Sequence, residues 1–475
     1  MDIEAFLSAD KSMVIAPAGY GKTHTIAEAI AAYKGEKKVL VLTHTHAGIA
    51  SLKKKFDDLH IPSSKYHLDT ICSYALVLTK TYHINKDEIP TEAQTSAMFN
   101  FAVEHATKIL HAKPIKSLLN AKFDHLIVDE YQDCTESQHR MIMEMSVTLK
   151  THLLGDPLQG IFGFGEAIVN FDHPSFAPFY ANSQQLGTPW RWLNAGRNDL
   201  GQDLALIREK LNNKEDVNLG DYHSIEFLLA TETDYTQKRS AYKQKVLDVL
   251  RDEDVLLIHP RSENPAGRVR FIQQFPQLRM IESIDDRSYY DYCDAFDSSE
   301  GNDLVVATVE MMRKLAKAGA IDVWFNDHCN LKRKRKEGDL RERNKLAGII
   351  EPLMARKSYG NVAALIEAIQ KLPEVKVYRK DMAEDLCKAL RDAERLGITA
   401  KEAIERNRNI IRRKGRRIQG KGIGTTLLTK GMEFDTVVVL NAHQFKDRKH
   451  LDVALARCCK RLVVIANTPV LHPYK

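Results

Sequence analysis

An uninterrupted apolar run that ends in two acids, Leu126-Ile127-Val128-Asp129-Glu130, constrains the fold of this chain more than any other feature. A short run of strand-forming residues between polar segments predicts a buried β-strand. Other short apolar runs alternate with helical patterns along the chain, and such alternation implies a parallel sheet covered by helices. Asp129 and Glu130 would then lie just beyond the carboxyl end of a strand, where ligands of open α/β sheets bind.

Apolar periodicity places the expected elements along both halves of the chain. In the amino-terminal half it predicts strands over 13–16, 39–43, 126–130 and 152–154, and helices over 23–33, 47–59 and 136–149. In the carboxyl-terminal half it predicts strands over 255–259, 436–441 and 461–467, with a mostly helical and charged stretch over 310–415. Residues 85–120 turn helical and polar, which indicates a small insertion rather than a further repeat of the sheet.

The segment Ala16-Pro17-Ala18-Gly19-Tyr20-Gly21-Lys22-Thr23 predicts a phosphate-binding loop between the first strand and the first helix. Its glycines let backbone N–H groups turn toward phosphate oxygens, Lys22 can reach the terminal phosphates, and Thr23 can ligate magnesium. Ala16 stands where the general pattern has glycine. With Asp129 as a metal ligand and Glu130 as the activator of water, the loop predicts that the chain binds a nucleoside triphosphate with Mg²⁺ and hydrolyses it.

Composition indicates an ordinary globular protein whose basic residues are clustered. The chain has 475 residues, too many for one compact core, and a formal net charge of only +6, but residues 332–336 are five consecutive cations. Seven cysteines include no Cys-x-x-Cys pair, so neither a disulfide framework nor a zinc ribbon is expected. No apolar stretch approaches the roughly 18 residues needed to cross a membrane, and the amino terminus is acidic where a secretory signal is basic. We therefore expect a soluble, cytoplasmic protein without a membrane partner.

Read in order, these residues resemble the signature motifs of superfamily 1 helicases of the UvrD/Rep type across nearly the whole chain. The phosphate loop resembles motif I, and residues 129–133 resemble the Asp-Glu-x-Gln-Asp form of motif II. The other similar segments are 40–47 (motif Ia), 69–71 (the threonine-centred segment after it), 155–164 (motif III), 189–192 (motif IV), 429–435 (motif V) and 453–460 (motif VI).

The resemblance implies an α/β fold with two RecA-like parallel-sheet domains and small helical insertions. The first, ATP-binding domain is expected over 1–84 and 121–185, with a helical insertion over 85–120. The second domain is expected over 186–309 and 416–475, with a reduced helical insertion over 310–415.

The resemblance also implies a hydrolytic site that draws on both domains. In the first domain, Lys22 and Thr23 would hold the β- and γ-phosphates and magnesium. Asp129 would order the metal, and Glu130 would activate the attacking water.

Further site residues are implied by motifs III to VI. Gln159 would contact the γ-phosphate, and Arg191 and Arg457 would meet the charge that develops on the transferred phosphoryl group, as arginine fingers do. Glu433 would face the nucleotide sugar or the metal. Plainer interpretations stay open for three of them: Arg191 as a structural arginine stacked between its two tryptophan neighbours, Arg457 as the flank of a helix, and Glu433 as a surface acid.

Nucleic-acid contacts are implied at the same edge of the sheets. Phe162 and Phe164 would stack on single-stranded bases from a glycine-rich loop, although two core phenylalanines are an alternative. Hydroxyl and imidazole groups would line the phosphate backbone, from Thr43, His44, Thr70, Thr425 and Thr429. On a helix, Arg408, Arg412 and Arg416 would form one stripe, which suits either a rail for phosphates or a solvated face.

The leading hypothesis is an ATP-driven translocase or helicase on single-stranded DNA, with 3′ to 5′ movement implied by the resemblance. The short insertions leave a second hypothesis open, a nucleotide-switched sensor of DNA ends that regulates a partner nuclease with little unwinding. A simple P-loop kinase is disfavoured because it has no use for segments 425–435 and 453–460. No glutamine precedes residue 94, so the adenine-recognising glutamine of such helicases is absent.

The end of the chain bears on its partners. Only 18 residues follow Arg457, too few for an attached nuclease domain, so we expect any nuclease or nuclease/ATPase to be a separate polypeptide. In size the chain is similar to the helicase subunit of Gabija antiphage systems, which implies a role in phage defence or DNA repair.

Overall fold

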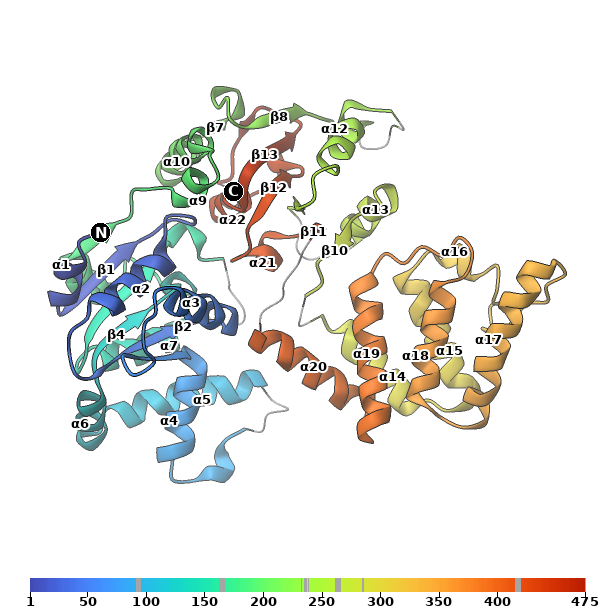
Figure 1. Ribbon diagram of the computed structural model, residues 1–475, viewed down its shortest axis with the longest axis horizontal. Coiled ribbons are helices and arrows are strands. Elements are labelled where there is room, and N and C mark those ends of the chain that lie inside the picture. Colours follow the sequence, from blue (N-terminus) through green and yellow to red (C-terminus); the bar gives the residue numbers. More distant parts are fainter. Residues whose placement is uncertain are drawn as a thin grey trace. The chain divides into compact units, whose positions relative to one another are not determined.

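The computed structural model describes residues 1–90, 95–161, 167–231, 233–234, 237, 239–260, 266–283, 286–414 and 420–474. The chain divides into two compact units (Figure 1). The first comprises Met1–Thr231, Arg413–Gly415 and Lys430–Lys475, and the second comprises Glu232–Arg412 and Arg416–Thr429. Apart from one antiparallel pair, the strands of the described residues run parallel to their neighbours: six form one sheet in the first unit, three more lie in the first unit, and three lie in the second. The fold class is therefore α/β, as the sequence predicts.

The first sheet lies wholly within the first unit, and its strands run parallel in the order β3-β2-β4-β5-β1-β6. Leu126, Ile127 and Val128 of the inner strand β4 are fully buried, as their apolar run predicts. Strands β3 and β6 form the edges, and periodicity missed both because a polar or very short strand carries little apolar pattern. The strands are β1 (Lys11–Ile15), β2 (Lys38–Thr43), β3 (Tyr66–Thr70), β4 (Phe123–Val128), β5 (Lys150–Gly155) and β6 (Ser183–Gln185).

Helices connect these strands and complete the core of the first sheet. Helix α5 packs against α4 and α7, and its Ala102 and Val103 share one buried core with Leu40 and Leu126 of the sheet. The helical stretch after β3 is thus packed onto the sheet. These helices are α1 (Ile3–Ser8), α2 (Lys22–Ala32), α3 (His46–Asp58), α4 (Ile71–Tyr82), η1 (Lys86–Glu88), α5 (Thr95–Leu110), α6 (Lys113–Lys122), η3 (Tyr131–Asp133), α7 (Glu136–Met145), η4 (Pro157–Gln159), η5 (Pro174–Phe176) and α8 (Ala177–Tyr180).

The rest of the first unit contains three parallel strands in the order β12-β13-β8 and the antiparallel pair β14-β7. The expected strands over 436–441 and 461–467 correspond to β12 and β13, whose central valines are fully buried. The elements are α9 (Trp190–Asn194), α10 (Asn198–Asn213), β7 (Val217–Asn218), η6 (Leu219–Asp221), β8 (Glu226–Leu229), β12 (Phe434–Val439), η7 (Ala442–Gln444), α22 (Arg448–Leu455), β13 (Cys458–Ala466) and β14 (Val470–Leu471).

The second unit combines three parallel strands in the order β10-β11-β9 with a group of helices that packs around its own apolar core (Figure 1). The strands and nearby helices are α12 (Ala241–Val249), β9 (Val255–Ile258), α13 (Ala266–Gln274), β10 (Arg279–Met280), β11 (Lys421–Gly424) and α21 (Thr426–Thr429). The helical group is α14 (Ser288–Ser298), α15 (Gly301–Leu315), α16 (Ala318–Ile321), α17 (Glu337–Ala355), α18 (Tyr359–Gln370), α19 (Lys380–Leu396) and α20 (Ala400–Lys414).

Arg408 corrects the expected arginine stripe on α20. Its side chain is fully buried, with the guanidinium 3.4 Å from the centre of the Tyr289 ring and 3.2 Å from Asp385 Oδ2. A buried cation held by an aromatic face and a carboxylate anchors the helix to α14 and α19. Neither the phosphate rail nor the solvated face describes this residue, and Arg416 lies outside the described residues.

Candidate nucleotide-binding and hydrolysis site

The phosphate loop joins β1 to α2 and is shaped by two glycines. Gly19 and Gly21 have φ angles of 82° and 87°, in the left-handed region that favours glycine. A Cβ atom at Gly19 would lie 2.9 Å from Cβ of Arg191, and one at Gly21 would lie 3.0 Å from Cδ1 of Trp190. Gly21 precedes the first residue of α2, so the amino terminus of that helix is open to an anion.

Lys22 lies against the two acids at the end of β4. Its Nζ atom is 2.5 Å from Glu130 Oε1 and 3.7 Å from Asp129 Oδ1. Burial alone would lower the pKa of Lys22, but the carboxylates of Glu130 and Asp129 outweigh it and raise that pKa. Thr23, which follows Lys22 in α2, is half-buried. The lysine is therefore held charged against the two acids.

The two acids differ in their electrostatic surroundings. Burial raises the pKa of Asp129 to about 6. Burial also acts to raise the pKa of Glu130, but the cations of Lys22 and Lys430 outweigh it and lower that pKa to about 2. Glu130 adopts a left-handed backbone with φ 54°, which is strained for a residue other than glycine and is found at functional sites.

Gln132 connects the acids to the segment that carries Gln159. Its amide nitrogen donates to Glu130 Oε2, and its Oε1 accepts a hydrogen bond of 2.9 Å from the backbone N–H of Asp156. A Cβ atom at Gly155 would lie 2.8 Å from Gln132 Oε1, so a side chain there would displace the Gln132 amide. The segments that carry Glu130 and Gln159 are thus fixed to each other through one buried side chain.

Arg457 lies at the end of α22, against Gln159. Its Nη2 atom is 3.4 Å from Gln159 Oε1, and its Nε and Nη1 atoms donate to the backbone oxygens of Val453 at 2.9 Å and Met432 at 3.3 Å. The residue is 2% exposed. Burial, reinforced by the cation of Arg191, lowers the pKa of Arg457 to about 10. An incompletely compensated buried cation of this kind is a favourable place for an anionic ligand.

Arg191 bridges the phosphate loop and the last elements of the chain. Its backbone N–H donates to Gly19 O at 2.9 Å, its Nη2 atom is 2.6 Å from Glu433 Oε1, and its Nη1 atom donates to Ala456 O. Its guanidinium is 5.5 Å from the centre of the Trp192 ring. A cation–π contact with one of the two tryptophan rings and contact with the loop therefore occur together. Glu433 is paired with this arginine, although its own side chain is 56% exposed.

Sequence reasoning assigned no role to five charged residues around Gln159. Lys430 forms a buried ion pair with Asp133, at 2.5 Å and 2.6 Å, and donates to Gln159 O. Arg208 donates to Asp452 Oδ2 at 3.0 Å and to Asp156 Oδ1. Lys430 and Asp133 lie inside motif-like segments, and this position could have marked them as candidate site residues. Arg208 lies in an ordinary helical pattern, and nothing in the sequence around it indicates a role in the site.

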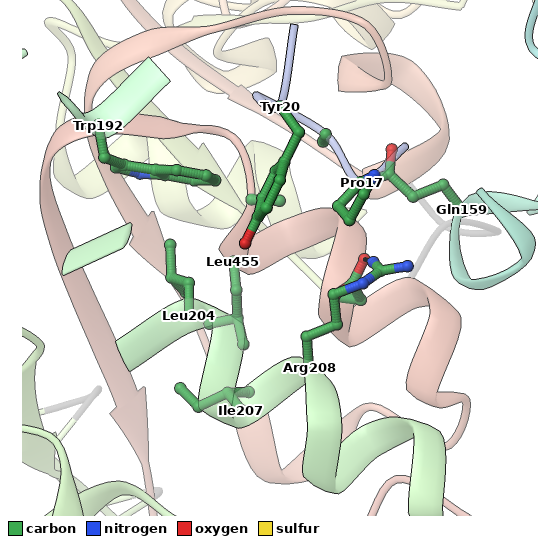
Figure 2. A pocket seen from close by; sticks show the side chains of 11 residues that line it. Pro17, Tyr20, Gln159, Trp192, Leu204, Ile207, Arg208 and Leu455 are labelled. Atoms are coloured by element: carbon green, nitrogen blue, oxygen red, sulfur yellow. Dashed lines mark hydrogen bonds and ion pairs between the residues drawn. The ribbon is translucent and has the colours of Figure 1, made fainter. Parts of the chain in front are cut away.

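A small pocket lies beside the phosphate loop (Figure 2). Tyr20 is directed from the loop into this pocket, which Trp192, Leu204 and Ile207 also line, with Arg208 at its polar side. The rings of Tyr20 and Trp192 meet edge to face, with centroids 6.3 Å apart. Burial raises the pKa of the Tyr20 hydroxyl. The Tyr20 side chain therefore anchors the loop to α10 and α22. Most other residues of the loop have only small side chains or none.

The residues expected to contact nucleic acid are only partly accessible. Thr43 and Thr70 are register partners at the carboxyl ends of β2 and β3, and both are buried. Thr70 Oγ1 caps α4 by accepting from Ser73 N at 3.0 Å, and His44 Nε2 is 3.3 Å from Cys134 Sγ.

In the second unit, Thr425 and Thr429 are also buried, and Thr429 Oγ1 donates to Thr425 O at 2.9 Å. Phe162 and Phe164 lie outside the described residues. The nucleic-acid roles of all seven residues stay predictions.

Comparisons with known proteins bear on the amino-terminal part of the chain. Residues 2–165 match a family described as an AAA domain. This range contains the phosphate loop, Asp129, Glu130 and Gln159. No curated protein matches the sequence.

Two solved structures of the Arterivirus nonstructural protein 10 (helicase) are similar to the chain. The one in complex with DNA has 9% identity and a TM-score of 0.34, and the match covers 98% of this chain and 62% of that one. The one without DNA has 9% identity and a TM-score of 0.30, with 98% and 61% covered. The chain therefore spans about three fifths of the length of these proteins. Within the described residues, no helix combines the length and apolar character needed to cross a bilayer.

Proposed function

We propose that this chain is a nucleoside triphosphate hydrolase that uses the energy of hydrolysis to move along single-stranded DNA. One observation carries the proposal. A continuous set of contacts runs from Lys22 through Glu130 and Gln132 to the segment of Gln159, and from Gln159 to Arg457. Residues far apart in sequence, in motif-like segments at both ends of the chain, thus converge on one phosphate loop.

Each residue has a role that its surroundings support. The backbone of loop 16–23, with Lys22, would hold the phosphates at the amino terminus of α2. Thr23 and Asp129 would hold Mg²⁺, and a hydroxyl and a carboxylate on an otherwise nucleotide-bound ion are the oxygen ligands that Mg²⁺ prefers. The ion would neutralise charge on the phosphates when bound. Glu130, whose pKa is held low, would remain an anion able to orient and activate a water.

The cations on the other side of the site would complete the hydrolytic machinery. Gln159 would contact the γ-phosphate, and Arg457 and Arg191 would stabilise the charge that spreads over the phosphoryl group in the transition state. Glu433 would position Arg191, to which it is paired. Because Arg457 follows the last helix of the chain and Gln159 follows β5, movement of one against the other would switch hydrolysis on and off.

The proposed work is translocation or unwinding, 3′ to 5′, by a UvrD/Rep-like arrangement of two RecA-like domains with helical insertions bounded as the sequence predicts. The support is the order of eight motif-like segments and the AAA domain match over residues 2–165. A separate nuclease partner and a role in phage defence remain part of the proposal. Co-purification from the native host followed by mass spectrometry tests both.

Hydrolysis measured with and without single-stranded oligonucleotide tests the central proposal. We expect slow ATP turnover alone and faster turnover with DNA. Lys22→Ala should lower turnover by about 100-fold or more, and Glu130→Gln should do the same while retaining nucleotide binding. Lys34→Ala, an exposed lysine just after the same helix, is the matched control and should behave as wild type.

Two results would count against the motor. Equal hydrolysis with and without oligonucleotide would remove the link between the nucleotide and DNA. DNA-stimulated hydrolysis without release of a labelled strand, and without movement along single-stranded DNA, would instead favour a nucleotide-switched sensor of DNA ends.

A further inference from the structure

Arg208 is held between two buried carboxylates that belong to different parts of the proposed site. Its Nη1 atom is 3.0 Å from Asp452 Oδ2, and its Nη2 atom contacts Asp156 Oδ1. The side chains of Asp156, Asp452 and Arg208 are 1%, 8% and 13% exposed. The carboxylates of Asp156 and Asp452 outweigh burial and raise the pKa of Arg208, so the guanidinium stays charged.

Asp156 starts the turn that carries Gln159. Its Oδ1 atom accepts a hydrogen bond of 3.1 Å from Leu158 N, and its backbone oxygen accepts one of 2.8 Å from Gln159 N. Its own N–H donates to Gln132, which contacts Glu130. A shift of the Asp156 carboxylate would therefore move the turn, and Gln159 with it.

Asp452 lies in α22, just ahead of Arg457. The Asp452 backbone oxygen accepts from Ala456 N at 2.9 Å, and the next residue, Val453, accepts from Arg457 Nε at 2.9 Å. Asp452 therefore belongs to the helical turn that aims the Arg457 guanidinium at Gln159. Arg208 itself comes from α10, a third element, and it touches neither Gln159 nor Arg457 through any described hydrogen bond.

We infer that Arg208 is a positioning residue that fixes Gln159 and Arg457 in the mutual geometry that hydrolysis requires. The planar guanidinium donates to the two carboxylates from two different nitrogens in fixed directions, a geometry that the single, compact ammonium group of a lysine does not reproduce. Misplacement of a reacting or stabilising group by about 1 Å costs on the order of 100-fold in rate. The inference rests on the proposed hydrolytic function.

Arg208→Met is the central variant. It leaves Asp156 and Asp452 facing each other without a cation, so both the alignment and the stability of the region should suffer. We expect kcat for DNA-stimulated ATP hydrolysis to fall by about 10- to 100-fold, with KM for ATP changed by less than about threefold. Arg208→Lys should lose nearly as much. Lys210→Met is the matched control. It also replaces a cation by methionine on the same helix, but at a partly exposed ion pair, and it should keep wild-type kcat.

Two further comparisons separate positioning from general structural support. Because Arg208 is inferred to act through Arg457, adding Arg208→Met to Arg457→Ala should lower kcat by less than about threefold further. Adding Asp452→Asn to Arg208→Met removes the repulsion between the carboxylates and should restore the melting temperature without restoring kcat. Asp452→Asn alone supplies the reference for this pair.

The outcomes are distinct. Wild-type kcat in Arg208→Met, full additivity with Arg457→Ala, or recovery of kcat together with the melting temperature would each overturn the inference. If Arg208→Met does not fold, Arg208→Lys and the Arg208→Met/Asp452→Asn protein carry the same comparisons. Absence of ATP turnover in the wild type, or turnover unaffected by Lys22→Ala, would overturn the proposed function itself, and with it the role of Arg208.

Discussion

Gly21 decides how the phosphate loop enters helix α2. Its φ of 87° costs a residue with a side chain about 1–2 kcal/mol, and a Cβ atom there would press on the Trp190 ring at 3.0 Å. We expect Gly21→Ala to lower the free energy of unfolding by about 1–2 kcal/mol and to weaken ATP binding, because the loop N–H groups lose their direction. Denaturant unfolding and nucleotide titration measure the two effects.

Gly187→Ala is the control for this prediction. Gly187 is not in the left-handed region, and a Cβ atom there would meet nothing within 4 Å. The change should leave ATP binding as in wild type and alter stability by less than about 0.5 kcal/mol. If both alanine variants bound ATP equally well, the glycine conformation of the loop would not be a requirement for binding.

Single residues were predictable where chemistry and a local pattern coincide. Lys22, Asp129 and Glu130 could be named because a loop or an apolar run beside them specifies the backbone. Arg208 could not, because its partners lie 52 and 244 residues away and its helix looks ordinary. The predicted stripe was wrong for Arg408 for the same reason. A four-residue spacing defines a helical face but not what packs on that face.

At the scale of elements, one buried ion pair joins the turn η3 to the segment before β12. The side chains of Lys430 and Asp133 are 6% and 4% exposed. Burial lowers the pKa of Lys430 and raises the pKa of Asp133 to about 7, so each charge depends on the other. Removing one partner of such a pair costs about 3–5 kcal/mol, whereas removing both is often nearly neutral.

We therefore expect Lys430→Met to lower the free energy of unfolding by about 3–5 kcal/mol and the double change with Asp133→Leu to recover most of it. Urea unfolding of the wild type, both single variants and the double variant completes the cycle. Equal losses in Lys430→Met and the double variant would mean that the pair is not what holds the two segments together.

Elements were predictable in proportion to their apolar content. The strands β1, β2, β4 and β5 and the helices α2, α3 and α7 lie within a few residues of their expected bounds, because each has a buried and strongly patterned face. Strand β3 reads Tyr-His-Leu-Asp-Thr and is mostly half-exposed, so its place at the edge of the sheet is set by pairing with β2. No local pattern carries that information.

At the scale of the whole molecule, stability in acid depends on histidines buried in the first sheet. Ser12, His152 and His125 form a chain across β1, β5 and β4, with a distance of 2.7 Å from Ser12 Oγ to His152 Nδ1 and 2.9 Å from His152 Nε2 to His125 Nδ1. Burial lowers the pKa of His125 to about 4, and burial also lowers that of His152. Both imidazoles are neutral in the folded chain.

The sign of the effect follows from these lowered pKa values. An unfolded histidine takes up a proton near pH 6.5, whereas the folded one resists until about pH 4, so stability is complete above pH 6.5 and falls as the pH drops toward 4. Buried acids with raised pKa values, such as Asp129 and Asp452, act in the opposite direction over part of this range. A comparison of variants isolates the histidine contribution, because those acids are common to all of them.

The prediction is that His125→Gln/His152→Gln, although less stable at neutral pH, loses less unfolding free energy between pH 6.5 and 4.5 than the wild type does. The difference should be about 1–3 kcal/mol for each histidine. His24→Gln, at an exposed position on α2, should keep the wild-type pH dependence. Urea unfolding at a series of pH values measures the loss of unfolding free energy in each protein. Parallel curves for the wild type and the double variant would mean that these imidazoles take up protons as readily in the folded chain as in the unfolded one, and the neutral Ser12-His152-His125 chain would have to be abandoned.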